Sequence, residues 1–343
     1  MIVLFSLYLN MPFKDLIINL VSKFSGELSA QKYPLDYCIP LYHTVSNQPL
    51  PHLKHLYPVK SEKEFEKDLD YLLKHFTFVD WEEFKRFRET KQTGEKKVAL
   101  LTFDDGFSEF LHVVAPILER KGIYAVNFVN PAFVDQQDML FRCKASLLAE
   151  KIQKEKIELK LLQSLSGLQN AGVQVISRHI LKTGYKKRDL LDLLAESIGL
   201  NFNEYIQAQK PYLDLTQLQE LRSRGFGIGA HSWDHPYYCE LTVDEQLETT
   251  FQSLDFIKTN GFLKDAFAFP FTDFGVSKSF FEQLYQNYPD VYSFGTAGIK
   301  TDSFTQNLQR IPLEHDTAAN ILPKETAYFR LKAPLKRNLI IRK

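Results

Sequence analysis

An apolar run at residues 97–103 is the feature that most constrains the fold of this 343-residue chain. The run predicts a buried strand. A helix is expected over about residues 107–121, Gly122 ends it, and a second apolar run follows at residues 124–129. Strand, helix and strand at this spacing form a βαβ unit, whose two strands pair in parallel. The chain is therefore predicted to be an α/β protein.

Similar strand and helix segments lie on both sides of this unit. Ser61 and Glu64 form a capping box ahead of an amphipathic helix. Further strands are expected at residues 38–43, 76–79, 226–230, 266–270, 291–294 and 307–313, and further helices at 81–88, 215–225 and 243–260. Repeated units without a dinucleotide-binding glycine loop favour a (β/α) barrel over a Rossmann sheet. In a barrel, the reactive groups lie at the C-terminal ends of the strands.

The chain divides into three segments around this barrel, which we expect at residues 31–316. Within it, residues 138–211 are rich in leucine, lysine, glutamine and glutamate, which predicts a helical insertion. Residues 1–30 carry apolar side chains on one face of a predicted helix. This amphipathic helix either docks on the barrel or lies in a membrane interface. Residues 317–343 are expected to form a basic C-terminal tail that is either solvated or in contact with anionic lipid.

Bulk composition excludes several classes of partner. Lysine plus arginine and aspartate plus glutamate both number 42, so no net field attracts nucleic acid. Three cysteines lie far apart without a CxxC pair, so neither a disulfide framework nor a zinc–thiolate site is indicated. No basic start precedes the apolar N-terminal residues. We therefore expect a cytoplasmic location, either free or peripheral at the inner membrane surface, and composition specifies no oligomeric state.

Two short segments carry candidate metal ligands, and each follows a predicted strand. Asp104, Asp105 and Gly106 follow one strand, while His231 and His235 follow another. The alternative is turn and helix-cap chemistry for the aspartates, and a core histidine with a surface one. Two imidazoles at this spacing, together with an adjacent pair of carboxylates, favour a divalent-metal site that activates water.

Two further strand ends add candidates for acid–base chemistry. Phe271 follows the strand at 266–270 and can present its backbone N–H to a developing oxyanion. The alternative for Phe271 is core packing. His315 stands beside Asp316 after the strand at 307–313. His315 is therefore either a proton donor to a leaving amine or an exposed loop residue.

These motifs together resemble the polysaccharide deacetylase family, also described as the NodB-homology group or carbohydrate esterase family four. The match rests on Thr-Phe-Asp-Asp-Gly at 102–106 and His-Ser-x-x-His at 231–235. Tyr42-His43 resembles the start of the branch that includes poly-N-acetylglucosamine deacetylases. The resemblance implies a distorted (β/α) barrel and a metal-dependent N-deacetylase that acts on amino sugars.

The resemblance also implies roles for the residues that match by position. Asp104 would be the general base, and His315 would be the general acid. Asp105, His231 and His235 would be the metal ligands. This ligand set suits zinc, and cobalt, nickel or iron also bind such sites.

The third motif of the family usually reads Arg-x-Pro-Tyr, whereas residues 268–271 here read Ala-Phe-Pro-Phe. The arginine that would steady the catalytic aspartate is therefore missing at this position. Arg310 is the expected substitute. Arg310, Tyr42 and His43 are also the expected substrate-binding residues.

Three functions are consistent with these motifs. The first is removal of N-acetyl groups from amino sugars of a glycan or a lipid-linked glycan precursor. The second keeps the metal site but hydrolyses a cyclic amide or imide, and the third is a non-catalytic carbohydrate-binding barrel. An open groove favours the first function, while a pocket sealed by the helical insertion favours the second.

Overall fold

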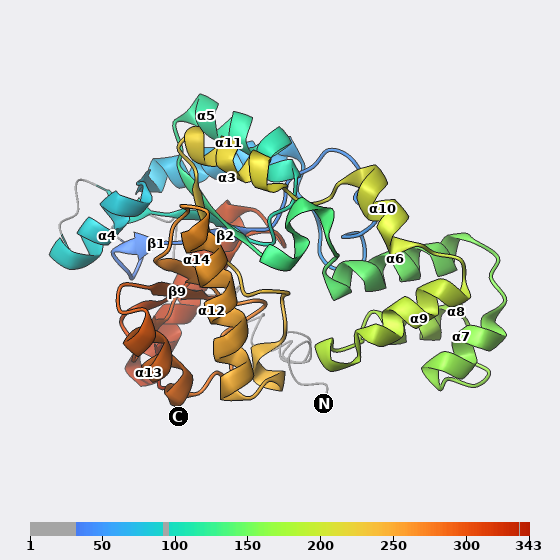
Figure 1. Ribbon diagram of the computed structural model, residues 1–343. Helices are drawn as coiled ribbons and strands as arrows, with labels where there is room; N and C mark the ends of the chain where they lie inside the picture. The colour runs from blue at the N-terminus through green and yellow to red at the C-terminus, as the bar shows by residue number, and fades with distance from the viewer. Residues whose placement is uncertain (1–31, 92–95, 336) are drawn as a thin grey trace.

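An eight-stranded parallel sheet, nearly closed into a barrel, forms the centre of the computed structural model (Figure 1). The structure describes residues 32–91, 96–335 and 337–343. Around the barrel the strand order is β11-β9-β8-β7-β6-β5-β2-β12. The bounds of these strands are β2 (Pro40–Tyr42), β5 (Leu101–Phe103), β6 (Ala125–Val129), β7 (Gly227–Ala230), β8 (Ala266–Ala268), β9 (Tyr292–Gly295), β11 (Asn307–Gln309) and β12 (Ile311–Pro312). The predicted α/β barrel with parallel strands is confirmed.

One short segment brings the two edges of this sheet together. β11 pairs with β9 at one edge, and β12 pairs with β2 at the other. Arg310 alone separates the two strands in the chain. Its backbone N–H donates to the carbonyl of Gly295, while the next N–H, that of Ile311, donates to Ile39. Arg310 therefore stands where the barrel closes.

Two predicted strands are each divided between two sheets. The segment at 97–103 forms β4 (Lys97–Ala99) and then β5, with a break at Leu100. The segment at 38–43 likewise forms β1 (Tyr37–Cys38) before β2. β1, β4 and β3 (Phe76–Phe78) make a three-stranded sheet outside the barrel. Because both segments pass from the small sheet into the barrel, the two sheets share a continuous apolar core.

Helices cover the outside of the barrel and have the expected start signals. Ser61 accepts a hydrogen bond from the backbone of Glu64, and the Glu64 carboxylate accepts one in return, so the predicted capping box is present. The helix expected from residue 107 begins instead as a π-helix at Phe110–Val114. The covering helices are α3 (Glu62–His75), α4 (Trp81–Thr90), α5 (Ala115–Lys121), α11 (Leu215–Ser223), α12 (Val243–Thr259), α13 (Lys278–Asn287) and α14 (Ala318–Lys332).

The predicted insertion forms a helical lobe beside the barrel, drawn in green on the right of Figure 1. It contains α6 (Phe141–Lys154), α7 (Leu159–Ser166), α8 (Val173–Ile180), α9 (Asp189–Ser197) and α10 (Phe202–Gln209). The lobe has an apolar core of its own, which includes the fully buried Leu148, Leu162 and Leu194. Phe107 from the barrel and Tyr212 at the end of the lobe stack with ring centroids 5.4 Å apart. Aromatic packing thus joins the lobe to the barrel.

The C-terminal segment is packed on the barrel, so the predicted basic tail at 317–343 is wrong as a structural description. α14 is followed by a 3₁₀ helix at Ala333–Leu335 and by β13 (Leu339–Ile340), which pairs with β10 (Thr301–Asp302). The prediction failed because it rested on the charged residues of this segment. Those charges do not show whether the apolar residues between them pack against the barrel. The predicted N-terminal helix lies outside the described residues. Among the described residues, no helix has the length and apolar character needed to cross a membrane.

Candidate metal centre and acid–base site

The two aspartates of the first motif lie in a sharp turn at the end of β5. The backbone of Asp105 has a φ of 74° and that of Gly106 a φ of 67°. This left-handed region is uncommon for residues with a side chain, although aspartate tolerates it better than most. At Gly106 an added Cβ would lie 3.0 Å from a methyl carbon of Val129. The turn holds both Asp104 and Asp105 buried, at 2% and 4% exposure.

The two histidines of the second motif lie in a turn at the end of β7. Ser232 and His235 both have a φ of 62°. Nδ1 of His231 lies 2.9 Å from the carbonyl oxygen of Ala268. When Nδ1 carries the ring proton and donates it to this carbonyl, the lone pair of Nε2 is available to bind a metal. Burial lowers the pKa of His235, which favours the neutral imidazole that metals bind.

Asp105, His231 and His235 come together in space, with ligand atoms all within 4.8 Å of one another. Oδ1 of Asp105 lies 3.1 Å from Nε2 of His235 and 3.4 Å from Nε2 of His231. Atoms that share a tetrahedral zinc ion at ~2.0–2.1 Å are about 3.3 Å apart. Oδ1 of Asp105 and Nε2 of His231 are also buried without a hydrogen-bond partner among the described residues. The three residues therefore fit one small divalent cation.

Asp104 is held by Arg310 through a bidentate ion pair. Nη1 and Nη2 of Arg310 donate to the two carboxylate oxygens over 2.6 and 2.7 Å. Burial would raise the pKa of Asp104, but the positive charge of the Arg310 guanidinium holds it below its usual value. Asp104 is therefore an ionised carboxylate at neutral pH, which can accept a proton.

Arg310 makes the contact expected of a substitute for the missing arginine of the third motif. Its side chain is fully buried, so it lacks the exposed surface that the predicted substrate-binding role requires. The same correction applies to Tyr42. Its ring is fully buried between Phe65 and Phe103, and its hydroxyl donates to Asp68 over 3.1 Å. As the last residue of β2, Tyr42 points into the core while the next side chain, His43, enters the site.

His43 forms a short contact with Glu314 beside the two aspartates. Its Nδ1 lies 2.6 Å from Oε1 of Glu314. Burial would lower the pKa of His43, but the charge of Glu314, its hydrogen bond and the charges of Asp105 and Asp104 raise it to about 10. His43 thus holds a proton at neutral pH in the absence of a metal cation, whose charge would oppose this effect.

The structure does not bring His315 into the site as the resemblance implied. The side chain of His315 is exposed in the loop after β12, and no hydrogen bond or ion pair among the described residues joins it to the aspartates. Its neighbour Glu314 is buried and reaches His43 instead. Sequence reasoning missed Glu314 and gave His43 only a substrate-binding role. The position of His43 at the end of a barrel strand was the available signal.

Phe271 lies against the metal ligands with an unusual backbone. Its φ is 56°, a strained conformation for a bulky side chain. The ring lies 4.4 Å from that of His235 and stacks on Tyr237 at 3.9 Å. Its carbonyl accepts a hydrogen bond from Thr296, while its N–H donates to no other described residue. The oxyanion role of this N–H stays a prediction.

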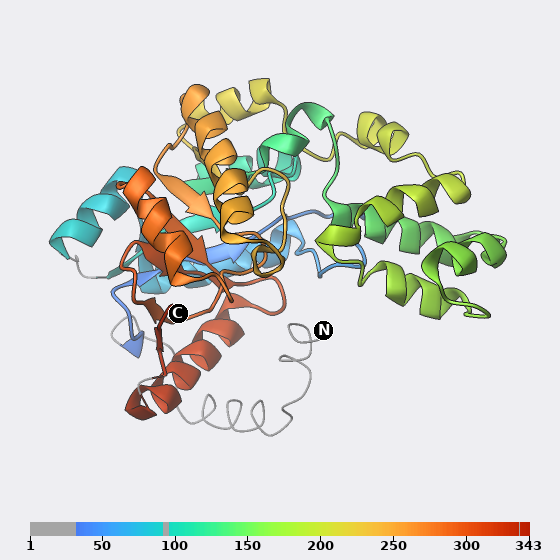
Figure 2. The same ribbon diagram turned by 60° about the horizontal axis from the view of Figure 1, so that its bottom comes forward.

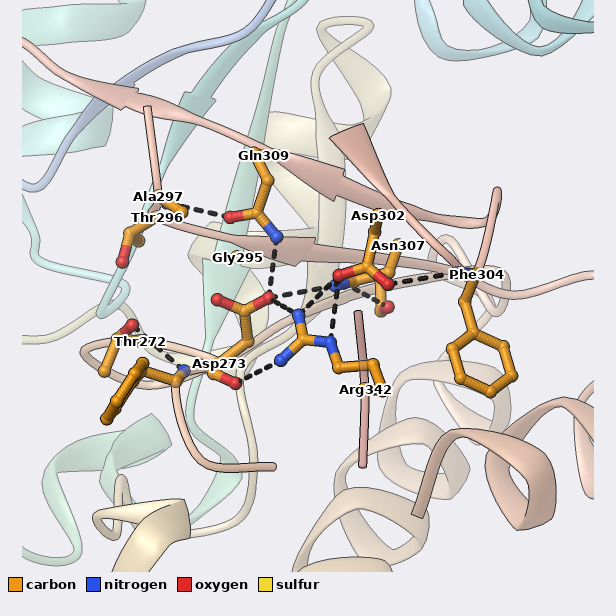
Figure 3. A network of polar contacts seen from close by, with 12 residues as sticks. Thr272, Asp273, Gly295, Thr296, Ala297, Asp302, Phe304, Asn307, Gln309 and Arg342 are labelled. Atoms are coloured by element: carbon orange, nitrogen blue, oxygen red, sulfur yellow. Dashed lines mark hydrogen bonds and ion pairs between the residues drawn. The ribbon is translucent and has the colours of Figure 1, made fainter. Parts of the chain in front are cut away.

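A buried network of charged residues supports the loop that carries Phe271 (Figure 3). Asp273, two residues further on, is paired with Arg342 from the C-terminal end of the chain, and Arg342 also donates to Asp302 over 2.6 Å. Gln309 of β11 donates to Asp273 over 2.6 Å, and Asn307 donates to it over 2.9 Å. One arginine thus pairs with two buried carboxylates, and the C-terminal end of the chain is tied to the loop that carries Phe271.

The helical insertion contacts the metal loop directly. The hydroxyl of Tyr185 donates to Asp234 over 2.5 Å, and Asp234 stands immediately before the ligand His235. Phe141 of α6 packs on Phe271 with centroids 6.2 Å apart. The lobe therefore forms one wall beside the metal site, a contact that the sequence did not predict.

Comparisons with known proteins agree with this geometry. The family model described as polysaccharide deacetylase matches residues 91–178, which include Asp104 and Asp105. No curated protein sequence matches the chain. Two solved structures share the fold at 16% sequence identity, each covering 84% of this chain and 97% of its own. They are the Streptococcus pyogenes deacetylase PplD in complex with acetate, with a TM-score of 0.53, and IcaB from Ammonifex degensii, with a TM-score of 0.52.

The likeness to PplD and IcaB shows a shared fold, and the family model adds the segment that carries the first motif. The chain therefore has the fold of PplD and IcaB, and its residues 91–178 are similar to the polysaccharide deacetylase family.

Proposed function

We propose that this protein is a metal-dependent deacetylase that removes N-acetyl groups from amino sugars of a glycan or a lipid-linked glycan precursor. One observation carries the proposal. Asp105, His231 and His235 converge within 4.8 Å next to Asp104, which is ionised and held by Arg310. The name of the fold neighbour PplD, a deacetylase solved with acetate, supports the same reaction.

Asp105, His231 and His235 would hold the metal ion. When bound, such an ion lowers the pKa of a coordinated water toward ~7 and polarises a carbonyl group. Zinc suits the two imidazoles and one carboxylate, and cobalt, nickel or iron bind similar sites.

The other residues supply the proton transfers of amide hydrolysis. Asp104 accepts a proton from the attacking water while the oxygen of that water bonds to the acetyl carbon. The backbone N–H of Phe271 donates to the acetyl oxygen as negative charge develops there. His43 gives its proton to the sugar nitrogen as the C–N bond breaks, and acetate and a free amine are released. Glu314 orients the His43 ring and keeps its proton in place.

The proposal is tested with the Asp104→Asn variant and N-acetylated chitooligosaccharides. Wild-type protein with stoichiometric metal should release acetate, and the variant should retain its metal but lose ~10²–10⁴ in rate. Acetate release that continues unimpaired in the variant would overturn the mechanism. Ring opening of cyclic ureides in place of acetate release would favour the cyclic-amide function. Glycan binding without turnover would favour the non-catalytic barrel.

A further inference from the structure

The C-terminal end of the chain exposes large apolar side chains on the surface. Leu331 and Leu335 are 43% and 63% exposed, and Leu339 and Ile341 are 47% and 72% exposed. We call these residues the C-terminal patch. Isolated exposed leucines are ordinary, whereas four within eleven consecutive positions form a concentrated apolar surface.

Two of these side chains lie in or next to β13. Leu339 is the first residue of β13, which pairs with β10, and Ile341 directly follows the strand. Arg342 points inward to Asp273 and Asp302, as Figure 3 shows, whereas Leu339 and Ile341 are exposed. Successive side chains of an extended segment point to opposite sides, which agrees with this arrangement.

The other two residues of the patch are held near this strand. Leu331 belongs to α14 and Leu335 to the following 3₁₀ helix. The side-chain amide of Asn338 donates to the carbonyl of Phe329 over 2.8 Å, which ties the strand to the end of α14. α14 is the dark-red helix at the lower edge of the coloured ribbon in Figure 2. The two segments that carry these apolar side chains thus lie next to each other.

Positive charge surrounds the C-terminal patch. Residues 326–343 contain six lysines or arginines and no aspartate or glutamate, although one of the six, Arg342, is buried and paired with Asp273 and Asp302. Arg330, Arg337 and Lys343 are exposed. An apolar surface with a cationic border is the pattern that binds anionic membranes.

We propose that the C-terminal patch docks this protein on an anionic lipid surface. A second copy of the chain is a poorer fit, because a twofold contact would bring the two uncompensated positive borders together. Lys32, the first described residue, accepts a hydrogen bond from Arg330 through its carbonyl oxygen. The start of the described chain therefore lies beside the end of α14, which carries Leu331. This inference does not rest on the proposed deacetylase activity.

The test measures co-sedimentation of the full chain with vesicles. One set contains phosphatidylcholine with phosphatidylglycerol, and the other contains phosphatidylcholine alone. We expect binding to the anionic vesicles only. The double variant Leu335→Ser/Ile341→Ser should lower the partition coefficient by ~10-fold or more, and Lys332→Gln/Arg337→Gln should lower it by a similar factor.

The matched control is the double variant Leu161→Ser/Leu193→Ser. These leucines are 50% and 54% exposed on the helical insertion, far from the C-terminus in the chain, and should leave binding unchanged. Circular dichroism and thermal unfolding check that all variants are folded. Failure of the wild type to bind anionic vesicles would overturn the proposal. Equal binding by the patch variants and the control would also overturn it, as would a wild-type dimer that the patch variants dissociate.

Discussion

Arg310 and Asp104 are joined by two hydrogen bonds of 2.6 and 2.7 Å, although 206 positions separate them in the chain. Arg310 stands between β11 and β12, the strands at the two edges of the barrel sheet. The same residue therefore takes part in closing the barrel and in holding the proposed base. In this protein, completion of the fold and orientation of Asp104 are coupled.

Replacement of Arg310 should separate the effect of its charge from that of its geometry. Arg310→Lys keeps a positive charge but cannot form the bidentate contact, so the rate of acetate release should fall by ~10²-fold. Arg310→Ala leaves the Asp104 carboxylate buried and unpaired, which should lower the free energy of unfolding by about 3–5 kcal/mol. Urea unfolding and acetate release measure the two effects. Wild-type activity in Arg310→Lys would contradict a positioning role.

Removal of metal should destabilise the protein apart from any effect on activity. A ligand that binds only the folded state at ~1,000 times its Kd adds about 4 kcal/mol of stability. Chelation should therefore lower the unfolding temperature of the wild type. Asp105→Asn should lose stoichiometric metal by elemental analysis, and its unfolding temperature should no longer respond to the chelator. If chelation has the same effect on both proteins, Asp105 is not a ligand.

The two candidate proton donors should respond differently to the same substitution. His43→Gln should lower the rate of acetate release by ~10²-fold or more, because the departing amine loses its proton source. His315→Gln is the matched control, and its exposed side chain predicts a change of less than ~2-fold. Steady-state rates at saturating substrate provide the comparison. A large loss in His315→Gln with an active His43→Gln would restore the assignment implied by family resemblance.

Acid should weaken the packing of residues 46–60 against the helical insertion through His52. This side chain is buried between Phe107 and Tyr205, with its Nδ1 2.9 Å from the Tyr205 hydroxyl. Burial lowers the pKa of His52 from 6.5 to about 4. Because the unfolded chain takes up a proton first, stability is fully present above pH ~6.5 and is lost as the pH falls toward ~4, by up to about 3 kcal/mol.

Urea unfolding from pH 7 to pH 4 measures this loss. His52→Gln should show a shallower decline of stability than the wild type across that range. The exposed His112→Gln serves as the control and should follow the wild-type curve. Parallel curves for His52→Gln and the wild type would show that His52 does not contribute.

Loss of Arg342 should destabilise the barrel from its C-terminal end. Arg342→Ala leaves Asp273 and Asp302 buried without their shared cation, so the free energy of unfolding should fall by about 3–5 kcal/mol. Arg337→Ala removes an exposed arginine from the same segment and should change stability by less than ~0.5 kcal/mol. Thermal and urea unfolding compare the two variants. Equal stability of both would show that the buried network is energetically unimportant.

Local patterns predicted much of this structure because the relevant forces act over short stretches of chain. The capping box at Ser61 and Glu64, the βαβ unit around residues 97–129 and the helical insertion all follow from local patterns of apolar and polar side chains. The positions of Asp105 and His235 after the ends of strands were also expected. Charge composition failed at the C-terminus, where Arg342 enters a buried network that depends on distant partners.

The sequence by itself determined the α/β barrel class, the two motifs with their candidate metal ligands, and the resemblance to polysaccharide deacetylases. Only the tertiary structure decided that Arg310 holds Asp104, that Glu314 contacts His43 while His315 is exposed, and that Tyr42 is a core residue. The physical reason is the range of the interactions. Periodicity and turn preferences are encoded by neighbouring residues, whereas an ion pair between residues about 200 positions apart exists only once the strands have closed the barrel.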